Sequence, residues 1–167
     1  GPVPLRLRGL AAGRLLQDGR SAALYDPDAV AETERSILGR PAGNHDGLAY
    51  MNPPFVAGLF RALAALTYRW AQAVWFAVSV LGLFASLALL WPELRTLPRR
   101  WAAVFVLAAL ASFPVVWSLL YGQVSSFVLL FWVLFYRGLK SDREMPAGVA
   151  LAGLLIKPQL ALVPAMY

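Results

Sequence analysis

Three long stretches of the chain are apolar throughout, without the regular polar interruptions of an amphipathic helix. No charged residue occurs in 70–92 or in 101–136, and Lys157 is the single charge in 146–167. A bilayer core about 30 Å thick needs about 20 apolar residues in a helix. As one helix at about 1.5 Å per residue, 101–136 would measure about 54 Å, so it must fold back near Tyr121-Gly122-Gln123. The pattern predicts an all-α, polytopic transmembrane helix bundle with spans over about 70–91, 101–119, 123–138 and 146–167.

The segment 1–50 is more polar and predicts an extracytoplasmic loop region that contains short helices. One helix is expected over about 5–17, closing at Gly19. A second is expected to start after Asp26, because aspartate is a good N-cap and Pro27 suits the first helical position. Gly39 should end it, since glycine readily adopts the left-handed conformation of a helix C-terminus.

Residues 51–68 form a third segment. Asn52 is a suitable cap, and Pro53 and Pro54 fit only at the start of a helix. The apolar helix expected over about 55–67 contains Arg61 and is short for a span. We therefore predict a re-entrant or interfacial helix here, followed by the transmembrane bundle over 69–167. If 55–67 were a full span instead, residues 1–50 would be cytoplasmic.

Charge supports a membrane protein and gives it an orientation. Hydrophobic residues make up 59% of the chain, only 14% of residues are charged, and the net charge is +6. Residues 1–50 balance to zero, and the excess basic residues lie mainly in two expected loops, 92–100 and 137–145. Cytoplasmic loops of membrane proteins are rich in Lys and Arg, so both loops should be cytoplasmic and nucleic-acid binding is not needed to explain the charge. The chain has no cysteine, so neither a disulfide framework nor a thiol nucleophile is expected. It has one histidine, so a zinc site is not expected either.

Lys157 is the residue that physical chemistry alone selects for a function. It would lie about 16 Å into the last span, where an ionisable group is costly and usually faces a cavity or a partner. Pro158 follows it and frees backbone groups, as in the broken helices that build ligand sites. The functional reading gives Lys157 an anionic partner such as a phosphate, whereas the alternative is a lysine that extends to the membrane surface.

Other candidates are more ambiguous. Gly122-Gln123 opens a span at the outer surface, where free N–H groups suit an anion, or it is an ordinary turn with a polar cap. Ser125 and Ser126 are expected to be small packing residues. Tyr50 and Asn52 either line a site or simply precede a helix.

Asp26 and Asp46 are the two outer carboxylates that we consider as candidates for a general base. An aspartate before proline is more often a cap, and Asp46 lies in a turn-forming sequence, Asn44-His45-Asp46-Gly47.

Taken in order, short elements of the chain resemble those of glycosyltransferase family 87. Members of that family are membrane proteins of the GT-C class and are of the polyprenol-phosphate-mannose-dependent mannosyltransferase type. These elements are Gly19 through Leu24-Tyr25-Asp26-Pro27, then Tyr50-Met51-Asn52-Pro53-Pro54-Phe55, Gly122-Gln123-Val124, and Ala147-Gly148 through Lys157-Pro158. Each is only two to six residues long, and the resemblance rests on their order and spacing. It covers nearly the whole chain, as an N-terminal portion of a typical member.

The resemblance implies transfer of a sugar, with mannose expected, from a polyprenyl-phosphate donor to a lipid or glycan acceptor on the extracytoplasmic face, with no cofactor. The partners expected are membrane lipids, donor and acceptor. Tyr50, Asn52, Gly122, Gln123 and Lys157 are the expected donor- or substrate-binding residues. A catalytic aspartate in family members precedes the stretch that resembles residues 5–25. We therefore assign no catalytic residue, and expect a fragment that is inactive alone.

Two other classes of function stay open from the residues alone. A transporter or lipid-handling protein would use the broken helix at Lys157 as a substrate site, and inverted repeats would favour it. The second open class is a non-catalytic membrane subunit. Thirteen arginines against two lysines, with abundant alanine, suggest a bacterial genome of high GC content. With the predicted spans, the expected location is a bacterial plasma membrane.

Overall fold

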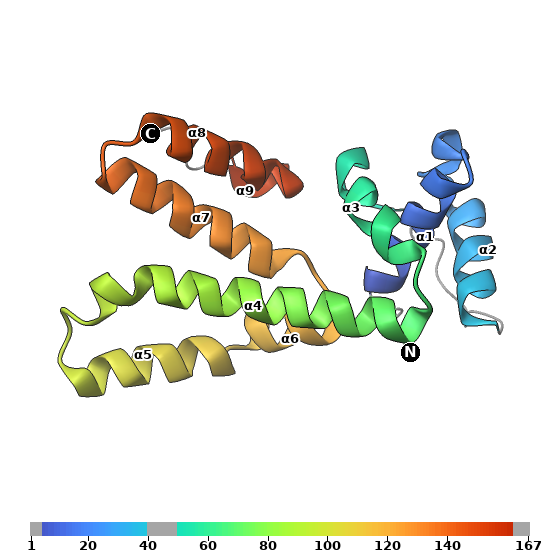
Figure 1. The fold of residues 1–167 in the computed structure, drawn as a ribbon. Helices are drawn as coiled ribbons and strands as arrows, with labels where there is room; N and C mark the ends of the chain where they lie inside the picture. The colour runs from blue at the N-terminus through green and yellow to red at the C-terminus, as the bar shows by residue number, and fades with distance from the viewer. Residues whose placement is uncertain (1–4, 40–49, 162–167) are drawn as a thin grey trace. The chain divides into compact units, whose positions relative to one another are not determined.

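The structure, a computed structural model, describes residues 5–39 and 50–161. The described residues form helices and connecting turns without a strand, so the predicted all-α class is confirmed. In chain order the elements are α1 (Leu5–Gln17), η1 (Ser21–Ala23), α2 (Pro27–Leu38), α3 (Pro54–Ala64), α4 (Tyr68–Leu94), α5 (Arg99–Ala111), α6 (Phe113–Tyr121), α7 (Ser125–Lys140), α8 (Glu144–Gly153), η2 (Leu154–Ile156) and α9 (Pro158–Ala161) (Figure 1). Contacts divide the chain into two units, Gly1–Phe76 and Ala77–Tyr167.

Local sequence signals fix helix α2 of the first unit. The Asp26 carboxylate accepts a hydrogen bond from the backbone N–H of Asp28 at 3.0 Å, and Pro27 occupies the first turn. Gly39 ends the helix with φ of 63°, a conformation that costs glycine little. The predicted start and end of α2 are therefore confirmed, as is α1 with its terminal Gly19 at φ of 71°.

Helices α1 and α3 approach so closely that their backbones nearly touch. A Cβ atom added to Gly13 would lie 2.6 Å from the carbonyl carbon of Phe60, closer than real contacts allow. At the end of α3, the side chains of Arg14 and Gln17 donate hydrogen bonds to the carbonyl groups of Ala64 (3.0 Å) and Arg61 (2.7 Å). Carbonyl groups in the last turn of a helix have no intrahelical partner, so α1 both packs against α3 and satisfies its terminus.

Helix α3 begins without a side-chain cap, so the prediction that Asn52 caps it was wrong. Pro53 is the N-cap residue and Pro54 the first helical residue, and their fixed φ angles suit a helix start. The backbone carbonyl of Asn52 instead accepts a hydrogen bond from the Tyr25 hydroxyl at 3.1 Å. With 11 residues, α3 is too short to cross a bilayer as one helix. Its membrane position stays a prediction.

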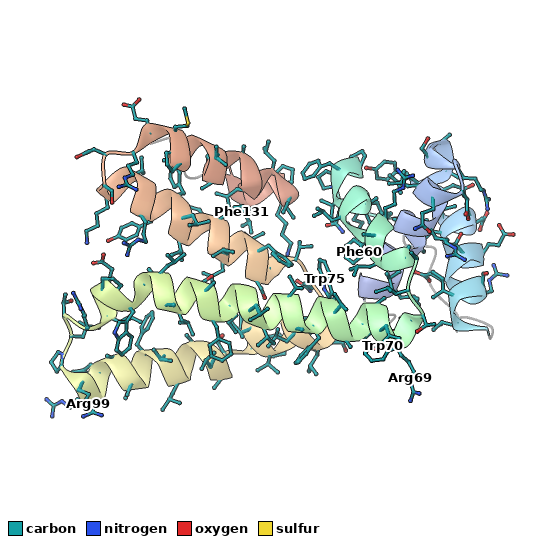
Figure 2. All side chains as sticks on the ribbon, in the orientation of Figure 1. Phe60, Arg69, Trp70, Trp75, Arg99 and Phe131 are labelled. Carbon is teal, nitrogen blue, oxygen red and sulfur yellow. The ribbon has the colours of Figure 1, made fainter. Side chains whose placement is uncertain are left out.

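An aromatic pair joins α3 to the first half of α4. The ring centroids of Phe60 and Trp75 lie 4.4 Å apart, and both side chains are buried (Figure 2). The same Phe60 ring covers Gly9 of α1, where a Cβ atom would come within 2.6 Å of it. The Phe60 ring thus occupies the space beside Gly9 of α1 and packs against Trp75 of α4.

A buried carboxylate in the first unit should make folding depend on pH. Glu34 on α2 is 2% exposed, and its Oε1 lies 3.8 Å from the Arg8 Nε. Burial raises the pKa of Glu34 above its ordinary value of 4.5, and the Arg8 charge opposes this only partly. In the pH window from 4.5 up to the raised pKa, the folded chain binds more protons than the unfolded chain.

Stability of the first unit should therefore fall as pH rises through that window. Glu34→Gln should remove this part of the pH dependence, because glutamine does not titrate. Thermal unfolding of the full-length protein and of the variant between pH 4 and 8 measures the effect. The exposed Glu32→Gln is the matched control. The same slope in Glu34→Gln as in the parent protein would contradict the assignment.

Most of the long apolar helix α4, and all of α5 and α6, belong to the second unit. Helix α4, with 27 residues, is long and apolar enough to cross a membrane, and α5 with α6 forms a second candidate if the bent pair is one span. The pair bends by 41° at Ser112, and Pro114 stands at the start of α6. Pro114 lacks the backbone N–H that a continuous helix would use there, which accounts for the break between α5 and α6. The described helices do not by themselves establish four spans.

The C-terminal ends of α4 and α7 lie together. The Lys140 ammonium is 2.6 Å from a Glu93 carboxylate oxygen, and the Arg137 guanidinium donates to the Leu89 carbonyl at 2.8 Å. The basic loops that follow these two helices are therefore at one end of the second unit. Basic residues from two parts of the sequence therefore lie near one another, as we expect of two loops on the same side of a membrane.

Helices α7 and α8 lie side by side and run in opposite directions (Figure 1). A Cβ atom on Gly138 would lie 2.9 Å from the backbone of Ala147, and one on Gly153 would lie 2.4 Å from the Phe131 ring. Gly138 near the end of α7 and Gly153 at the end of α8 thus allow close packing at both ends of the contact, a frequent feature of membrane helices. This packing fixes the register of α8 against α7.

The last segment is interrupted rather than continuous. Helix α8 ends at Gly153, the 3₁₀ turn η2 follows, and Lys157 has φ of −130° and ψ of 86°, which is not helical. The short helix α9 then begins at Pro158. The break predicted at Lys157-Pro158 is present, and a straight helix from 146 does not pass through it.

Candidate functional site

Three polar side chains from two separate parts of the sequence meet in the second unit. The ammonium group of Lys157 donates a hydrogen bond to the Ser125 hydroxyl at 3.1 Å. The Ser125 hydroxyl in turn donates to the side-chain oxygen of Gln123 at 3.2 Å. The order is ammonium, hydroxyl, amide oxygen, and each of the first two groups donates one hydrogen bond to the next. We call Gln123, Ser125 and Lys157 the lysine cluster.

The backbone between α6 and α7 places two members of the cluster. Gly122 ends α6 in the left-handed conformation with φ of 66°, and the backbone N–H of Gln123 donates to the Ser118 carbonyl at 2.9 Å. This arrangement is typical of glycine-terminated helices. Helix α7 therefore begins at Ser125, two residues later than the predicted start of the span at 123.

The N–H groups available to an anion differ from those expected at Gly122-Gln123. The N–H of Gln123 is already bonded, whereas the first N–H groups of a helix lack intrahelical acceptors. In α7 these belong to Ser125 and Ser126. They lie next to the side chain that Lys157 contacts, so an ammonium group and the positive end of a helix dipole share one place.

The expected depth of Lys157, about 16 Å into the last span, stays a prediction. Counting along a straight helix from Pro146 put the lysine near the bilayer centre. In the structure α8 and then η2 pack along α7, and the Lys157 ammonium reaches the first turn of α7. The cluster is thus at the end of α7 opposite to the arginine-rich loops, separated from them by about 24 Å for 16 residues.

The charge of Lys157 is not neutralised within the described part of the chain. No carboxylate among the described residues forms an ion pair with it, and the Ser125 hydroxyl is its hydrogen-bond acceptor. A partly buried cation with one neutral acceptor retains donors for an anion. The arrangement is suited to holding a negatively charged group.

Tyr50 and Asn52 belong to the first unit. Tyr50 is 2% exposed and packs in a core with these residues: Ala11, Ala12, Leu15, Leu24, Val30 and Ala57. Its hydroxyl is buried without a hydrogen-bond partner in the described part of the chain, and burial raises its pKa. The side chain of Asn52 is partly buried. The structure brings Gln123 and Lys157 together through Ser125, and the binding role of Tyr50 and Asn52 stays a prediction.

The described carboxylates do not supply an evident base at this site. Asp26 caps α2, as its position before Pro27 suggested, and Asp46 lies outside the described residues. In the described ranges, no group of three or more His, Asp or Glu side chains is arranged to hold a metal ion. The chemistry that the cluster offers is anion binding rather than proton abstraction.

Ser125 is the member of the cluster that sequence reasoning missed. We expected both serines to be packing residues, and only Ser126 meets that description, since it is 7% exposed and its backbone lies 3.8 Å from a Cβ added to Gly82. A hydroxyl at the first position of a helix was the available signal. Its contact with Lys157 depends on the register of α7 against α8, which local sequence does not reveal.

Comparison with known proteins identifies the family. Residues 50–167, more than half of the chain, match the family described as glycosyltransferase family 87. The match includes both α7 and the broken segment that carries Lys157. No curated protein and no solved structure gives a significant match to the chain. On the strength of the match over 50–167, the chain belongs to glycosyltransferase family 87.

Proposed function

We propose that this glycosyltransferase is an integral membrane enzyme that transfers a hexose, with mannose as the leading candidate, from a polyprenyl-phosphate donor to a lipid or glycan acceptor. The observation that supports a phosphate-linked donor is the lysine cluster. A cation, a hydroxyl and the free N–H groups at the start of α7 converge at one place, which is the chemistry that recognises a phosphate. The donor needs no separate cofactor.

The cluster would act on the leaving group of the reaction. Transfer breaks the bond between the anomeric carbon and a phosphate oxygen, and forms a bond from that carbon to an acceptor hydroxyl oxygen. Negative charge grows on the departing phosphate, and the Lys157 ammonium would stabilise it more in the transition state than in the ground state. The acceptor proton passes to a base, for which we assign no residue.

Placement in a membrane is supported by the second unit. Only 28% of the apolar window of α4 is buried in the structure, and large apolar side chains such as Leu81, Phe84 and Leu107 are more than half exposed. The arginine-rich loops gather at one end, which would be cytoplasmic. The lysine cluster at the other end of α7 would then face the outer side of a bacterial plasma membrane.

A direct test is the choice of donor. The full-length protein, reconstituted in liposomes, should transfer radiolabelled mannose from polyprenyl-phosphate mannose to extracted membrane acceptors. The same sugar offered as a nucleotide sugar should give no product. Product from the nucleotide sugar alone would overturn the proposal.

Sidedness is tested separately with introduced cysteines, since the described chain has none of its own. Gln123→Cys and Arg99→Cys, each in a cysteine-free full-length protein, should react with an impermeant maleimide from opposite sides of the membrane. Labelling of both from the same side would contradict the proposed orientation.

A further inference from the structure

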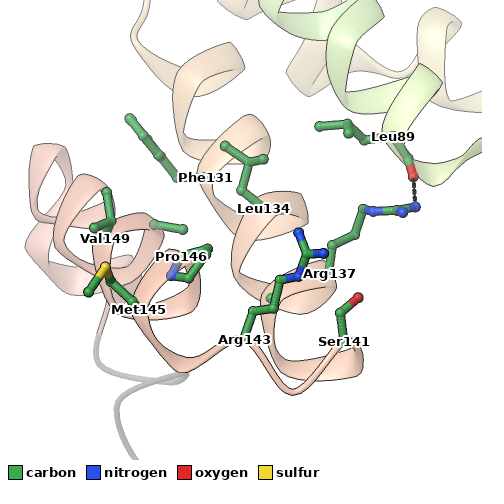
Figure 3. Close-up of a pocket in the computed structure, with 11 residues that line it drawn as sticks. Leu89, Phe131, Leu134, Arg137, Ser141, Arg143, Met145, Pro146 and Val149 are labelled. Atoms are coloured by element: carbon green, nitrogen blue, oxygen red, sulfur yellow. Dashed lines mark hydrogen bonds between the residues drawn. The ribbon is translucent and has the colours of Figure 1, made fainter.

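A pocket of about 480 Å³ lies in the second unit at the end of α7 away from the lysine cluster. Residues of α4, α7, α8 and the loop between α7 and α8 line it. One end of its wall is basic and the other is apolar (Figure 3). A cavity of this size is in the range of small-molecule sites, so its lining indicates what it would hold.

The basic end consists of Arg137 and Arg143. Both side chains line the pocket, and the Arg137 guanidinium is held by its 2.8 Å hydrogen bond to the Leu89 carbonyl (Figure 3). The lining residues include both arginines and no carboxylate. Asp142 and Glu144 flank Arg143 in the sequence, and neither lines the pocket. Two cations in the lining of one pocket repel each other, and a bound anion would offset that repulsion.

The apolar end opens outward. Phe131 and Leu134 of α7 face Val149 of α8 across it, and Val149 is 66% exposed (Figure 3). Met145 at the rim is 82% exposed. The groove therefore continues the exposed apolar surface of these helices. A ligand that fills it would carry an apolar portion along the helices and an anionic group at the loop.

We propose that this pocket binds an anionic phospholipid of the cytoplasmic leaflet, with its phosphate between Arg137 and Arg143 and an acyl chain against Phe131, Leu134 and Val149. Guanidinium groups bind phosphate oxygens in a bidentate manner, and basic pockets between membrane helices on the cytoplasmic side suit anionic headgroups. A second pocket of about 810 Å³ at the neighbouring loop is also lined by two arginines, Arg95 and Arg99, beside apolar residues. The proposal rests on the membrane placement proposed above and is independent of the donor.

Competition binding tests the lipid preference. The full-length protein in detergent is loaded with fluorescent phosphatidylglycerol, which is displaced by unlabelled phosphatidylglycerol or phosphatidylcholine. We expect phosphatidylglycerol to compete at least about five-fold better, because the choline ammonium offsets the attraction of the phosphate to the arginines. Arg143→Gln should weaken phosphatidylglycerol binding by about five-fold and leave phosphatidylcholine unchanged. Val149→Trp should weaken binding of both lipids by filling the groove.

Arg100→Gln is the matched control, since it removes an exposed arginine at the same end of the unit that does not line this pocket. It should leave lipid binding unchanged. An equal loss in Arg100→Gln and Arg143→Gln, or equal affinity for the two lipids, would overturn the pocket assignment. Glycerol phosphate that binds as tightly as the lipid would overturn the role of the acyl chain. A protein that does not insert into liposomes would overturn the proposed membrane placement. Failure of that placement is thereby distinguished from failure of the lipid pocket alone.

Discussion

Replacement of Lys157 by methionine should reduce glycosyl transfer by about 100-fold or more. Methionine keeps the length and apolar stem of lysine but removes the charge that faces the developing phosphate. Loss of one preorganised donor to a developing anion typically lowers the catalytic rate by about 10² to 10³. Initial rates of the reconstituted full-length protein with polyprenyl-phosphate mannose measure the effect.

Two further variants make this result interpretable. Lys140→Met removes the other lysine of the chain, an exposed residue paired with Glu93, and should leave the rate unchanged. Ser125→Ala should lower the rate less than Lys157→Met does, because it removes a neutral contact that positions the ammonium group. Full activity in Lys157→Met would refute a donor-binding role for this lysine, provided that the variant inserts and folds normally.

Gly13→Ala should destabilise the first unit by about 1–3 kcal/mol, the usual cost of inserting a methyl group into a packed contact. The new Cβ atom would lie 2.6 Å from the Phe60 carbonyl carbon, and backbone atoms cannot move aside as a flexible side chain can. Helices α1 and α3 would have to separate. The hydrogen bonds from Arg14 and Gln17 to the end of α3 would then lengthen. Thermal unfolding of the full-length protein measures the change.

Gly58→Ala is the control for that experiment. Gly58 lies within α3, and a Cβ atom added to it meets nothing within 4 Å. Alanine there should stabilise the helix by up to about 1 kcal/mol through its higher helix propensity. If the two substitutions shift the unfolding temperature in the same direction, close packing at Gly13 is not the cause.

Sequence reasoning was most accurate where one local interaction decides the outcome. The N-cap Asp26, the first-turn Pro27 and the terminal Gly39 act within a few residues of one another, and together they define α2. The bend between α5 and α6 is equally local, because Pro114 cannot donate the backbone hydrogen bond of a helix interior. Asn52 failed as a cap because two successive prolines began α3 after Pro53.

The candidate site was only partly predictable, because its geometry depends on packing. Lys157 stood out from its apolar surroundings, and the Gly122-Gln123 turn from its place between apolar runs. The contact of Lys157 with Ser125, 32 positions earlier, requires α8 to pack antiparallel to α7 with glycines at both ends. The apolar pattern also did not reveal the turn η2, which interrupts the helix just before Lys157.

The short length of α7 affects how the enzyme would fit its membrane. Its 16 residues span about 24 Å, less than the roughly 30 Å hydrocarbon thickness of an average bilayer. This hydrophobic mismatch would thin the lipid beside α7 and draw the outer headgroups toward Lys157. A donor phosphate at ordinary headgroup depth would then reach the ammonium group without entering the hydrocarbon, so liposomes of long-chain lipids should raise the apparent donor KM.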